Sequence, residues 1–432
     1  MKVLIGRGFT QLITSRRLRA GQRWLAALPR VLLGSAAQLE YCHQLDDPYS
    51  HLLLQLLSPL LRQYRVQLTV HLVPPPTTAA APEPTRLRDW SRRDAAQLAR
   101  QLGLEFSADA IQANAEQLRL ANQAALAVLG RSDALEQLLQ ISRALWSGDC
   151  TALQLRAASV SPAELELALS SAAARRRKLG HYLGATLFFE GESYWGVDRL
   201  RYLEQRLRGA GLARGTLTWL APLPRVECRA KPTSSAQPQL YFYCSFRSPY
   251  TYLAVARVRQ LAEHYGAQLQ LRFVLPMAMR GLPVPLEKRL YIVRDSKREA
   301  EQLGLRFGDI ADPLGAPTER GLAVLHQAIG LGKGGEFAES FLQGVFADGI
   351  DAGSDAGLQL LASRAGLDAE VVATALADQS WRAVAEANRQ ELFSLGLWGV
   401  PSFRVDNCPV QWGQDRLWLI ERDLIVATAA RD

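Results

Sequence analysis

The sequence predicts an α/β protein in which one order of strands and helices occurs twice. Blocks of sequence from the first half recur, in the same order, in the second half. The clearest pair is LEYCHQLDDPYSHL at 39–52 and LYFYCSFRSPYTYL at 240–253, which makes Pro48 equivalent to Pro249, 201 residues later. Because order is repeated as well as content, the pattern indicates two related domains in tandem.

Two further pairs of blocks support this division. RRDAAQLARQLGLEF at 92–106 aligns with VRDSKREAEQLGLRF at 293–307, again 201 residues apart. YWGVDRLRYLE at 194–204 aligns with QWGQDRLWLIE at 411–421. With 432 residues, 48% of them hydrophobic, the chain is long enough to form two hydrophobic cores.

The strands and helices follow the same order in each half. Apolar and polar residues alternate at 66–73 and 267–275, as in half-buried strands, and a strand and a helix precede each of these segments. Long helical stretches follow, at about 86–178 and 286–392. Each half ends with two short strands and a helix, with the strands expected at 185–190, 194–195, 402–405 and 410–412. The order β-α-β, helices, β-β-α predicts a thioredoxin-like sheet with an α-helical insertion.

These patterns predict the domain boundaries. We expect a basic, helical N-terminal segment at 1–38, a first thioredoxin-like domain at 39–211 and a second one at 240–432, which carries the candidate site. Prolines interrupt any regular pattern at 212–239, which is therefore the expected linker. No run approaches 18 uninterrupted apolar residues, so no membrane-spanning helix is expected.

The N-terminal segment accounts for much of the net charge of +8. It contains no acidic residue, and its basic residues are Lys2, Arg7, Arg16, Arg17, Arg19, Arg23 and Arg30. Such a segment is compatible with a transit-like peptide or with a helix that faces lipid or nucleic acid. The interpretation that we favour is an amphipathic helix that leads into the first domain, and we expect no nucleic-acid partner.

The cysteines argue against several kinds of site. The chain has five, and no two of them form a C-x-x-C pair. A disulfide framework, a zinc site and a dithiol redox centre are therefore disfavoured, and a reducing compartment, with the cytoplasm as the expected location, is favoured. No metal site is expected, since His43 has no second ligand near it in the sequence.

Ser248 and Pro249 stand where a strand gives way to a helix. Serine is a good N-cap and proline fits the first helical position, so the pair can simply start a helix. The same geometry places a hydroxyl beside unpaired amides at the positive end of the helix dipole, where a thiolate would be stabilised. The equivalent residue in the first half is Asp47.

Three further positions are candidates for the same site. Val400-Pro401 opens a strand, which indicates either a turn or a cis bond that directs the preceding backbone towards a ligand. The first half has no proline here, and an alignment of Gly184 with Gly399 puts Thr186 in its place.

Asp415, in the turn Trp412–Leu417, either caps a helix or binds a ligand ammonium group. Lys288 is either a solvated helix residue or a functional lysine. The functional interpretation rests on its counterpart, Leu87, because the half that lacks the serine and the proline lacks this lysine as well.

Together these residues resemble the glutathione-dependent branch of the DsbA-like thioredoxin superfamily, which contains kappa-class glutathione transferases and 2-hydroxychromene-2-carboxylate isomerases. The resemblance rests on FRSPYTYL, the K-x-x-Y-x-x-x-D pattern of Lys288, Tyr291 and Asp295, GLWGVPSF and WGQDRL, and covers nearly all of 238–423. It implies a DsbA/kappa-type domain in which two redox cysteines have been replaced by hydroxyl residues. Arg247 is bulkier and more charged than the residue usual in the family.

The resemblance also implies roles for individual residues. Ser248 would hydrogen-bond the glutathione sulfur and stabilise its thiolate, and the Val400 backbone before cis-Pro401 would pair with the cysteinyl backbone. Gln414 and Asp415 would hold the γ-glutamyl end, and Lys288 would bind a carboxylate or the substrate.

The first half resembles the same fold with this site dismantled, since Asp47 and Leu87 replace the serine and the lysine. A carboxylate beside a thiol raises the thiol pKa. We expect this half to be non-catalytic and to mimic the second subunit of a homodimer, so that the protein is a monomer.

The sequence therefore predicts a glutathione-dependent isomerase or transferase that acts on a small electrophilic, aromatic substrate. The alternative is a non-catalytic binding or chaperone-like protein that keeps the double thioredoxin-like fold. Dithiol–disulfide exchange is a weaker third possibility, because there is no C-x-x-C pair.

Overall fold

A computed structural model describes residues 2–157, 159–215, 218–229 and 235–429. The chain divides into two compact units. We call the one made of Ala20–Leu223 and Pro285–Lys288 the N-terminal unit. The C-terminal unit consists of the remaining segments, Met1–Arg19, Pro224–Val284 and Arg289–Asp432. Of the expected linker at 212–239, residues 216–217 and 230–234 lie outside the described residues.

The N-terminal unit contains a four-stranded sheet in the order β2-β1-β3-β4. Its strands are β1 (Gln38–His43), β2 (Gln67–Leu72), β3 (Thr186–Phe189) and β4 (Glu192–Trp195). β1 is parallel to β2 and antiparallel to β3. β1 and β2 are joined through a helix, as a parallel pair requires.

Most helices of this unit lie between β2 and β3. The helix that joins β1 to β2 is α3, which is capped by Asp47 and has Pro48 at the first helical position, where no amide donor is needed. The helices are α3 (Pro48–Gln63), α4 (Pro84–Leu102), α5 (Ala115–Val128), α6 (Ala134–Ser147), α7 (Cys150–Ala157), α8 (Pro162–Lys178), the 3-10 helix η1 (Val197–Arg199) and α9 (Leu200–Gly209). Leu39 and Tyr41 of β1 and Leu53 of α3 are buried in the core that these helices form with the sheet.

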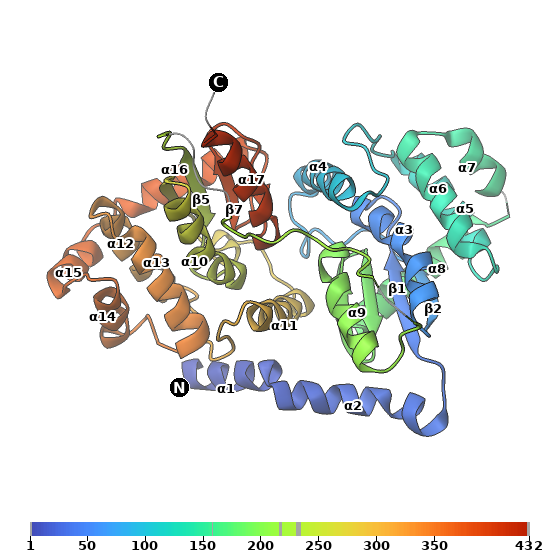
Figure 1. Cartoon of the computed structure of the whole chain (residues 1–432), viewed down its shortest axis with the longest axis horizontal. Helices are drawn as coiled ribbons and strands as arrows, with labels where there is room; N and C mark the ends of the chain where they lie inside the picture. Colours follow the sequence, from blue (N-terminus) through green and yellow to red (C-terminus); the bar gives the residue numbers. More distant parts are fainter. Residues whose placement is uncertain (1, 158, 216–217, 230–234, 430–432) are drawn as a thin grey trace. The chain divides into compact units, whose positions relative to one another are not determined.

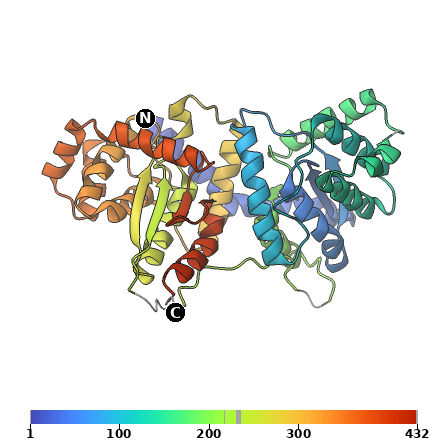
Figure 2. The same cartoon turned by 90° about the horizontal axis from the view of Figure 1, so that it is seen from above.

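The C-terminal unit contains a second four-stranded sheet, in the equivalent order β6-β5-β7-β8. Its strands are β5 (Gln239–Cys244), β6 (Gln268–Phe273), β7 (Ser402–Val405) and β8 (Gln411–Trp412). β5 is parallel to β6 and antiparallel to β7, as in the first sheet. In Figure 2 the strands β5 and β6 lie between the red helix α17 and the orange helices of the insertion.

The C-terminal helices repeat the same plan (Figure 1). α10 connects β5 to β6, the insertion lies between β6 and β7, and α17 ends the unit. The helices are α10 (Pro249–His264), the 3-10 helix η2 (Met277–Arg280), α11 (Leu286–Gln302), α12 (Ala316–Gly330), α13 (Gly334–Gln343), the π-helical turn η3 (Gly344–Asp348), α14 (Asp355–Arg364), α15 (Ala369–Ala377), α16 (Trp381–Ser394), the 3-10 helix η4 (Gln414–Arg416) and α17 (Leu417–Ala427). The predicted fold class, an α/β protein with two sheets that each carry a helical insertion, is confirmed.

The strand register corrects one expectation. Thr186 pairs with Cys42 on β1, and Ser402 pairs with Tyr243, the residue 201 positions after Cys42. Thr186 is therefore equivalent to Ser402, and Ala185, not Thr186, occupies the place of Pro401.

The neighbouring hydrogen bonds agree with this register. The Gly196 amide donates to the Ala185 carbonyl at 2.8 Å, and the Gly413 amide donates to the Pro401 carbonyl at 2.9 Å. The expectation that Thr186 takes the place of the proline is wrong, because the pairing of the strands, and not a shared glycine, fixes the equivalence.

The basic N-terminal segment forms two helices, α1 (Lys2–Thr14) and α2 (Arg16–Leu33), which follow one another in Figure 1. Within the C-terminal unit, Arg7 pairs with Asp309 at 2.8 Å, and Arg16 and Arg19 both pair with Glu301. The later arginines of α2 pair with glutamates of the N-terminal unit. No helix in the described part of the chain is long and apolar enough to cross a membrane.

Candidate active site

Ser248 lies at the start of α10, in extended backbone with φ −97° and ψ 112°. Its Oγ accepts a hydrogen bond from the Thr251 amide at 3.2 Å, which makes it the N-cap of a 16-residue helix. The cap leaves the hydroxyl at the positive end of the helix dipole. The structural and the functional interpretations of Ser248 are thus compatible.

The backbone of Val400 meets Ser248 across 152 residues of sequence. The Ser248 hydroxyl donates to the Val400 carbonyl at 3.5 Å, a long hydrogen bond. The Val400–Pro401 peptide bond is cis. The fold therefore brings together the serine, the helix start and the Val400-Pro401 pair.

Two more hydroxyl groups beside Ser248 are buried without a hydrogen-bond partner among the described residues. They are Thr251 Oγ1, on a residue that is fully buried, and Ser245 Oγ, on a residue that is 2% exposed. An unpaired buried hydroxyl is unfavourable, so this helix start has unused hydrogen-bonding capacity. By the resemblance drawn from the sequence, Ser248 and Thr251 are the two hydroxyl residues that replace the redox cysteines.

The equivalent helix start in the N-terminal unit is fully paired. Asp47 accepts hydrogen bonds from the Tyr49 and Ser50 amides at 3.3 and 3.1 Å. Ser50, the counterpart of Thr251, donates its hydroxyl to Asp47 at 2.8 Å and accepts from the Ala185 amide, also at 2.8 Å.

The counterpart of Ala185 is Pro401, which has no amide hydrogen to give. This difference removes from Thr251 the donor that Ser50 has. One proline thus accounts for part of the contrast between the two helix starts.

Burial, with a smaller contribution from the nearby Asp46, raises the pKa of Asp47 to about 7. The hydrogen bonds from Ser50 and Tyr49 act in the opposite direction and only partly compensate. In its ionised form, a carboxylate at this position repels a thiolate and cannot stabilise it in the way that a hydroxyl can.

The tyrosine of the shared Pro-Tyr pair has the same bond in both units. Tyr49 donates to Asp94 at 2.8 Å, and Tyr250 donates to Asp295 at 2.8 Å. Each bond ties the start of a helix to the first helix after the second strand. Asp295, part of the pattern that carries the resemblance, therefore has a structural bond that both units share.

Gln414 lies in a hydrogen-bonded network of the C-terminal unit. It is 3% exposed, and its carbonyl oxygen accepts from Arg257 at 2.8 Å. Its amide group donates to Glu299 at 3.1 Å and to Asp415 at 2.6 Å. Arg257 and Glu299 were not singled out from the sequence, where charged helix residues are typical of solvated faces.

Lys288 is described within the N-terminal unit. Its Nζ donates to the Ala80 carbonyl at 2.7 Å and lies 5.7 Å from the centroid of the Tyr182 ring. Burial lowers the pKa of Lys288 to about 8. Its assignment to a ligand carboxylate stays a prediction, as do the roles of Gln414 and Asp415.

The residues next to the site are held by specific contacts. Arg247 makes a bidentate ion pair with Asp312, at 2.7 and 2.8 Å, which accommodates a bulky charged residue directly before Ser248. The Trp412 ring packs against Trp398 and covers Gly399 so closely that a Cβ atom there would overlap the indole.

The described cysteine side chains are free and lie off the helix start. Cys244, at the end of β5, is buried, and burial raises its pKa to about 12. Cys408 also has a raised pKa because of burial and nearby carboxylates. Among the described residues no cluster of His, Cys, Asp or Glu side chains could hold a metal ion.

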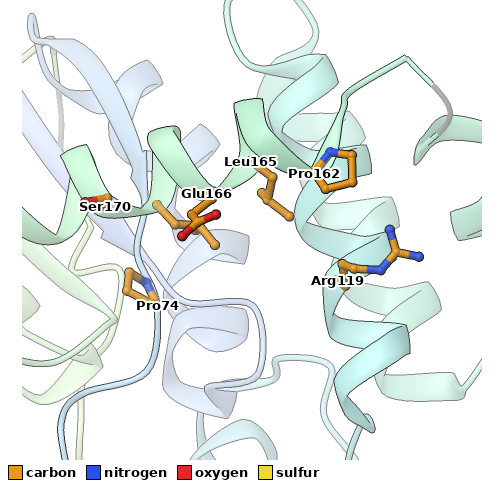
Figure 3. Close-up of a pocket in the computed structure, with 7 residues that line it drawn as sticks. Pro74, Arg119, Pro162, Leu165, Glu166 and Ser170 are labelled. Carbon is orange, nitrogen blue, oxygen red and sulfur yellow. The ribbon is translucent and has the colours of Figure 1, made fainter.

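Two pockets lie elsewhere on the units. One, of about 350 Å³, is lined by Pro74, by Arg119 of α5 and by residues of α8 such as Leu165 (Figure 3). The other, of about 720 Å³, lies between α10, β6 and the turn before α13. None of the predicted site residues lines either pocket.

A comparison with protein families matches one segment of the second half of the chain. Residues 239–424 match the DSBA-like thioredoxin domain. The match includes the whole of the C-terminal sheet, Ser248 and the Val400-Pro401 pair. We call residues 239–424 the DsbA-like domain. The comparison with curated protein sequences found no match.

Three of the similar solved structures each cover less than half of this chain. A 2-hydroxychromene-2-carboxylate isomerase is 20% identical and covers 43% of this chain and 94% of its own, with a TM-score of 0.38. A probable DsbA oxidoreductase from Streptomyces coelicolor is 24% identical and covers 45% and 92%, with a TM-score of 0.37. The cytosolic disulfide reductase DsbM from Pseudomonas aeruginosa, solved with GSH, is 18% identical and covers 44% and 96%, with a TM-score of 0.34.

Proposed function

We propose that the DsbA-like domain binds glutathione and uses it to isomerise or conjugate a small electrophilic substrate, with Ser248 stabilising the glutathione thiolate. The observation that carries the proposal is the set of polar groups at the start of α10. The Ser248 hydroxyl caps the helix, its bond to Val400 is long at 3.5 Å, and the Thr251 hydroxyl has no partner among the described residues.

These residues fit the thiol end of glutathione. A thiolate needs hydrogen-bond donors and positive potential, and the N-terminus of α10 offers both. The described thiols of the chain are not at this place, so the sulfur must come from the ligand. Glutathione, when bound, supplies a thiolate nucleophile that can add to an electrophilic carbon.

The chain's own groups act before and during such a reaction. The Ser248 hydroxyl turns from the Val400 carbonyl to the sulfur and holds the negative charge there. Its Oγ still accepts the Thr251 amide, so the helix keeps its cap. The Val400 backbone is then available to pair with the peptide backbone of the ligand, and Asp415, which accepts a hydrogen bond from Gln414, is the carboxylate proposed for the ligand's ammonium group.

The N-terminal unit is proposed to be non-catalytic. At its helix start, Ser50 donates to Asp47 and accepts from the Ala185 amide, so these polar groups are already engaged and are not available to a thiolate. We propose that this unit acts as a built-in partner for the DsbA-like domain in a cytoplasmic protein. The test is a variant that lacks residues 20–223 and keeps Lys288. This role is excluded if that variant is monomeric and fully active.

The proposal is tested by titrating the full chain with glutathione in a calorimeter and by measuring turnover of an aromatic electrophile with and without glutathione. Ser248→Ala should keep the fold, lower the free energy of unfolding by about 1 kcal/mol through loss of the cap, and lower turnover about 10²-fold. Asp47→Asn, at the equivalent position of the other unit, is the matched control and should leave turnover unchanged.

The outcomes separate the possible functions. Glutathione binding with turnover that depends on Ser248 supports the proposal. No heat of binding and no thermal shift at millimolar glutathione would contradict it and favour a non-catalytic binding protein. Equal losses in Ser248→Ala and Asp47→Asn would show that the variants act through stability and not through the site.

A further inference from the structure

Helix α2 has an apolar face that no described residue covers. Trp24, Leu25, Val31 and Leu32 are 64%, 59%, 65% and 72% exposed, and we call these four side chains the apolar face of α2. None of the residues of α2 is buried. Single exposed leucines are ordinary, but four large apolar side chains on neighbouring turns form an interaction surface.

The opposite face of α2 is fixed to the N-terminal unit by ion pairs. Arg23 pairs with Glu192 at 2.8 Å, and Arg30 pairs with Glu190 at 2.8 Å. The side chains of Glu190 and Glu192 are only 9% and 13% exposed, and Arg206 pairs with both. Nearly buried carboxylates need these counter-charges, so α2 is part of the folded unit.

The helical period separates the two faces. Successive residues of an α-helix are about 100° apart, so Leu25 and Leu32 lie about 200° around the helix from Arg23 and Arg30. Ala26, on the arginine side, lies near Gly191 in the turn between β3 and β4. The ion pairs therefore turn the leucines away from the protein.

We propose that the apolar face of α2 docks on the surface of a lipid bilayer that contains anionic headgroups. An interfacial helix has leucine and tryptophan on one face, basic residues elsewhere and no need to span the bilayer. α2 has five arginines and no acidic residue, and the three glutamates that pair with it leave an excess of positive charge. Arg17, exposed and without a partner among the described residues, adds to this excess.

The same contacts disfavour the other occupants. Nucleic acid is bound mainly through its phosphates, and it offers no apolar phase in which the exposed side chains of Leu25, Val31 and Leu32 would be buried. Trp24–Leu33 is ten residues, about 15 Å of helix, so its apolar strip covers a few hundred Å² at most. A stable protein interface needs roughly 800 Å² per partner, so a second copy would gain too little from this face alone.

The test is flotation of the full chain with vesicles of phosphatidylcholine alone and with vesicles that also contain phosphatidylglycerol. The wild type should bind the anionic vesicles more strongly than the neutral ones. The double variant Leu25→Glu/Leu32→Glu should lower the partition coefficient by about tenfold or more, since charges replace the inserted side chains. Leu167→Glu is the matched control, because Leu167 on α8 is also an exposed leucine, at 73%, and should leave binding unchanged.

Four results would overturn the proposal, three from vesicle binding and light scattering and one from competition with DNA. The first three are no binding of the wild type to either kind of vesicle, binding that the double variant keeps, and a wild-type dimer that the double variant dissociates in light scattering. Preference for a DNA duplex over anionic vesicles in competition would do the same. Thermal melts of both variants confirm that they are folded, and turnover of the DsbA-like domain is not needed for any of these readouts.

Discussion

Helices α3 and α10 begin with the same Pro-Tyr pair, yet the polar groups around their first turns differ in kind. In α3 the carboxylate of Asp47 and the hydroxyl of Ser50 satisfy each other and the neighbouring amides. In α10 the Ser248 hydroxyl makes one good bond and one long one, and Thr251 has no partner among the described residues. The comparison separates a helix start that is complete from one that can still bind something.

The bonds common to both units show what the fold itself needs. The Tyr49–Asp94 and Tyr250–Asp295 bonds have the same length and join equivalent elements. What differs is the cap residue and the residue before the third strand. The fold tolerates either cap, so the serine and the proline are the positions to which the proposed function assigns the difference between the two units.

Exchanging the cap residues tests this comparison with the largest expected effect. Ser248→Asp keeps a good N-cap but places a carboxylate beside the proposed thiolate, which raises the thiol pKa by like-charge repulsion. Glutathione-dependent turnover should fall by about 10²–10³-fold, as measured by steady-state kinetics.

The reciprocal exchange should not create a second site. In Asp47→Ser the Ser50 hydroxyl and the Ala185 amide still pair with each other. Turnover should stay at the wild-type level in the otherwise unchanged chain and at background level when combined with Ser248→Ala. Activity in that double variant would show that the cap residue alone defines the site.

The elevated pKa of Asp47 predicts a pH-dependent stability. Folded Asp47 keeps its proton up to about pH 7, whereas an unfolded aspartate loses it near pH 4. The folded state binds more protons in this window, so this group's contribution to the free energy of unfolding falls as the pH rises from about 4 to 7, and is constant above.

Asp47→Asn removes this dependence. The free energy of unfolding of the variant minus that of the wild type should therefore increase between about pH 4 and pH 7, by about 1.4 kcal/mol for each unit of pKa shift. Urea denaturation at pH 5 and pH 8 measures this. If the free energies of unfolding of variant and wild type differ by the same amount at both pH values, Asp47 is not held protonated in the folded state.

The strands and helices that position the site were predictable from the sequence, but the equivalence of residues near the third strand of each unit was not. Alternation over 267–275 predicted β6, and the Ser-Pro pair predicted the start of α10, because both signals are local. The equivalence of Ala185 and Pro401 was not predictable from an ungapped alignment, since only the pairing of β3 with β1 fixes it.

Lys288 and Gln414 show the limit of sequence patterns for the site. Both belong to motifs that resemble a family, yet the partner of each side chain is set by residues far away, Ala80 for the lysine and Glu299 for the glutamine. Helix periodicity says which face a residue occupies but not which long-range partner it meets.

Introduced thiols would report the electrostatics of the two helix starts directly. In Ser248→Cys the N-terminus of α10 should lower the thiol pKa below its ordinary value of about 8.5. In Asp47→Cys burial and the nearby Asp46 should hold it higher, with a difference of about one unit. The pH dependence of alkylation by iodoacetamide measures both, after subtraction of the wild-type rate. In the wild type, burial raises the pKa values of Cys42 and Cys244 to about 12, and the pKa values of the part-exposed Cys228 and Cys408 are raised as well.

Equal pKa values for the two introduced thiols would contradict the comparison. The helix dipole is present in both units, so equality would mean that the dipole dominates and the neighbouring groups do not matter. A lower pKa in Asp47→Cys than in Ser248→Cys would reverse the assignment of the two sites.

The most direct test of the central claim is the pKa of the glutathione thiol when bound to the protein, followed by the ultraviolet absorbance of the thiolate. With the wild type this pKa should lie below that of free glutathione. Ser248→Ala should raise it by about 1–2 units, as expected for loss of one hydrogen bond to a charged group, while Asp47→Asn should leave it unchanged. A bound thiol pKa equal to that of free glutathione, or one that Ser248→Ala does not change, would contradict the claim that Ser248 stabilises a thiolate.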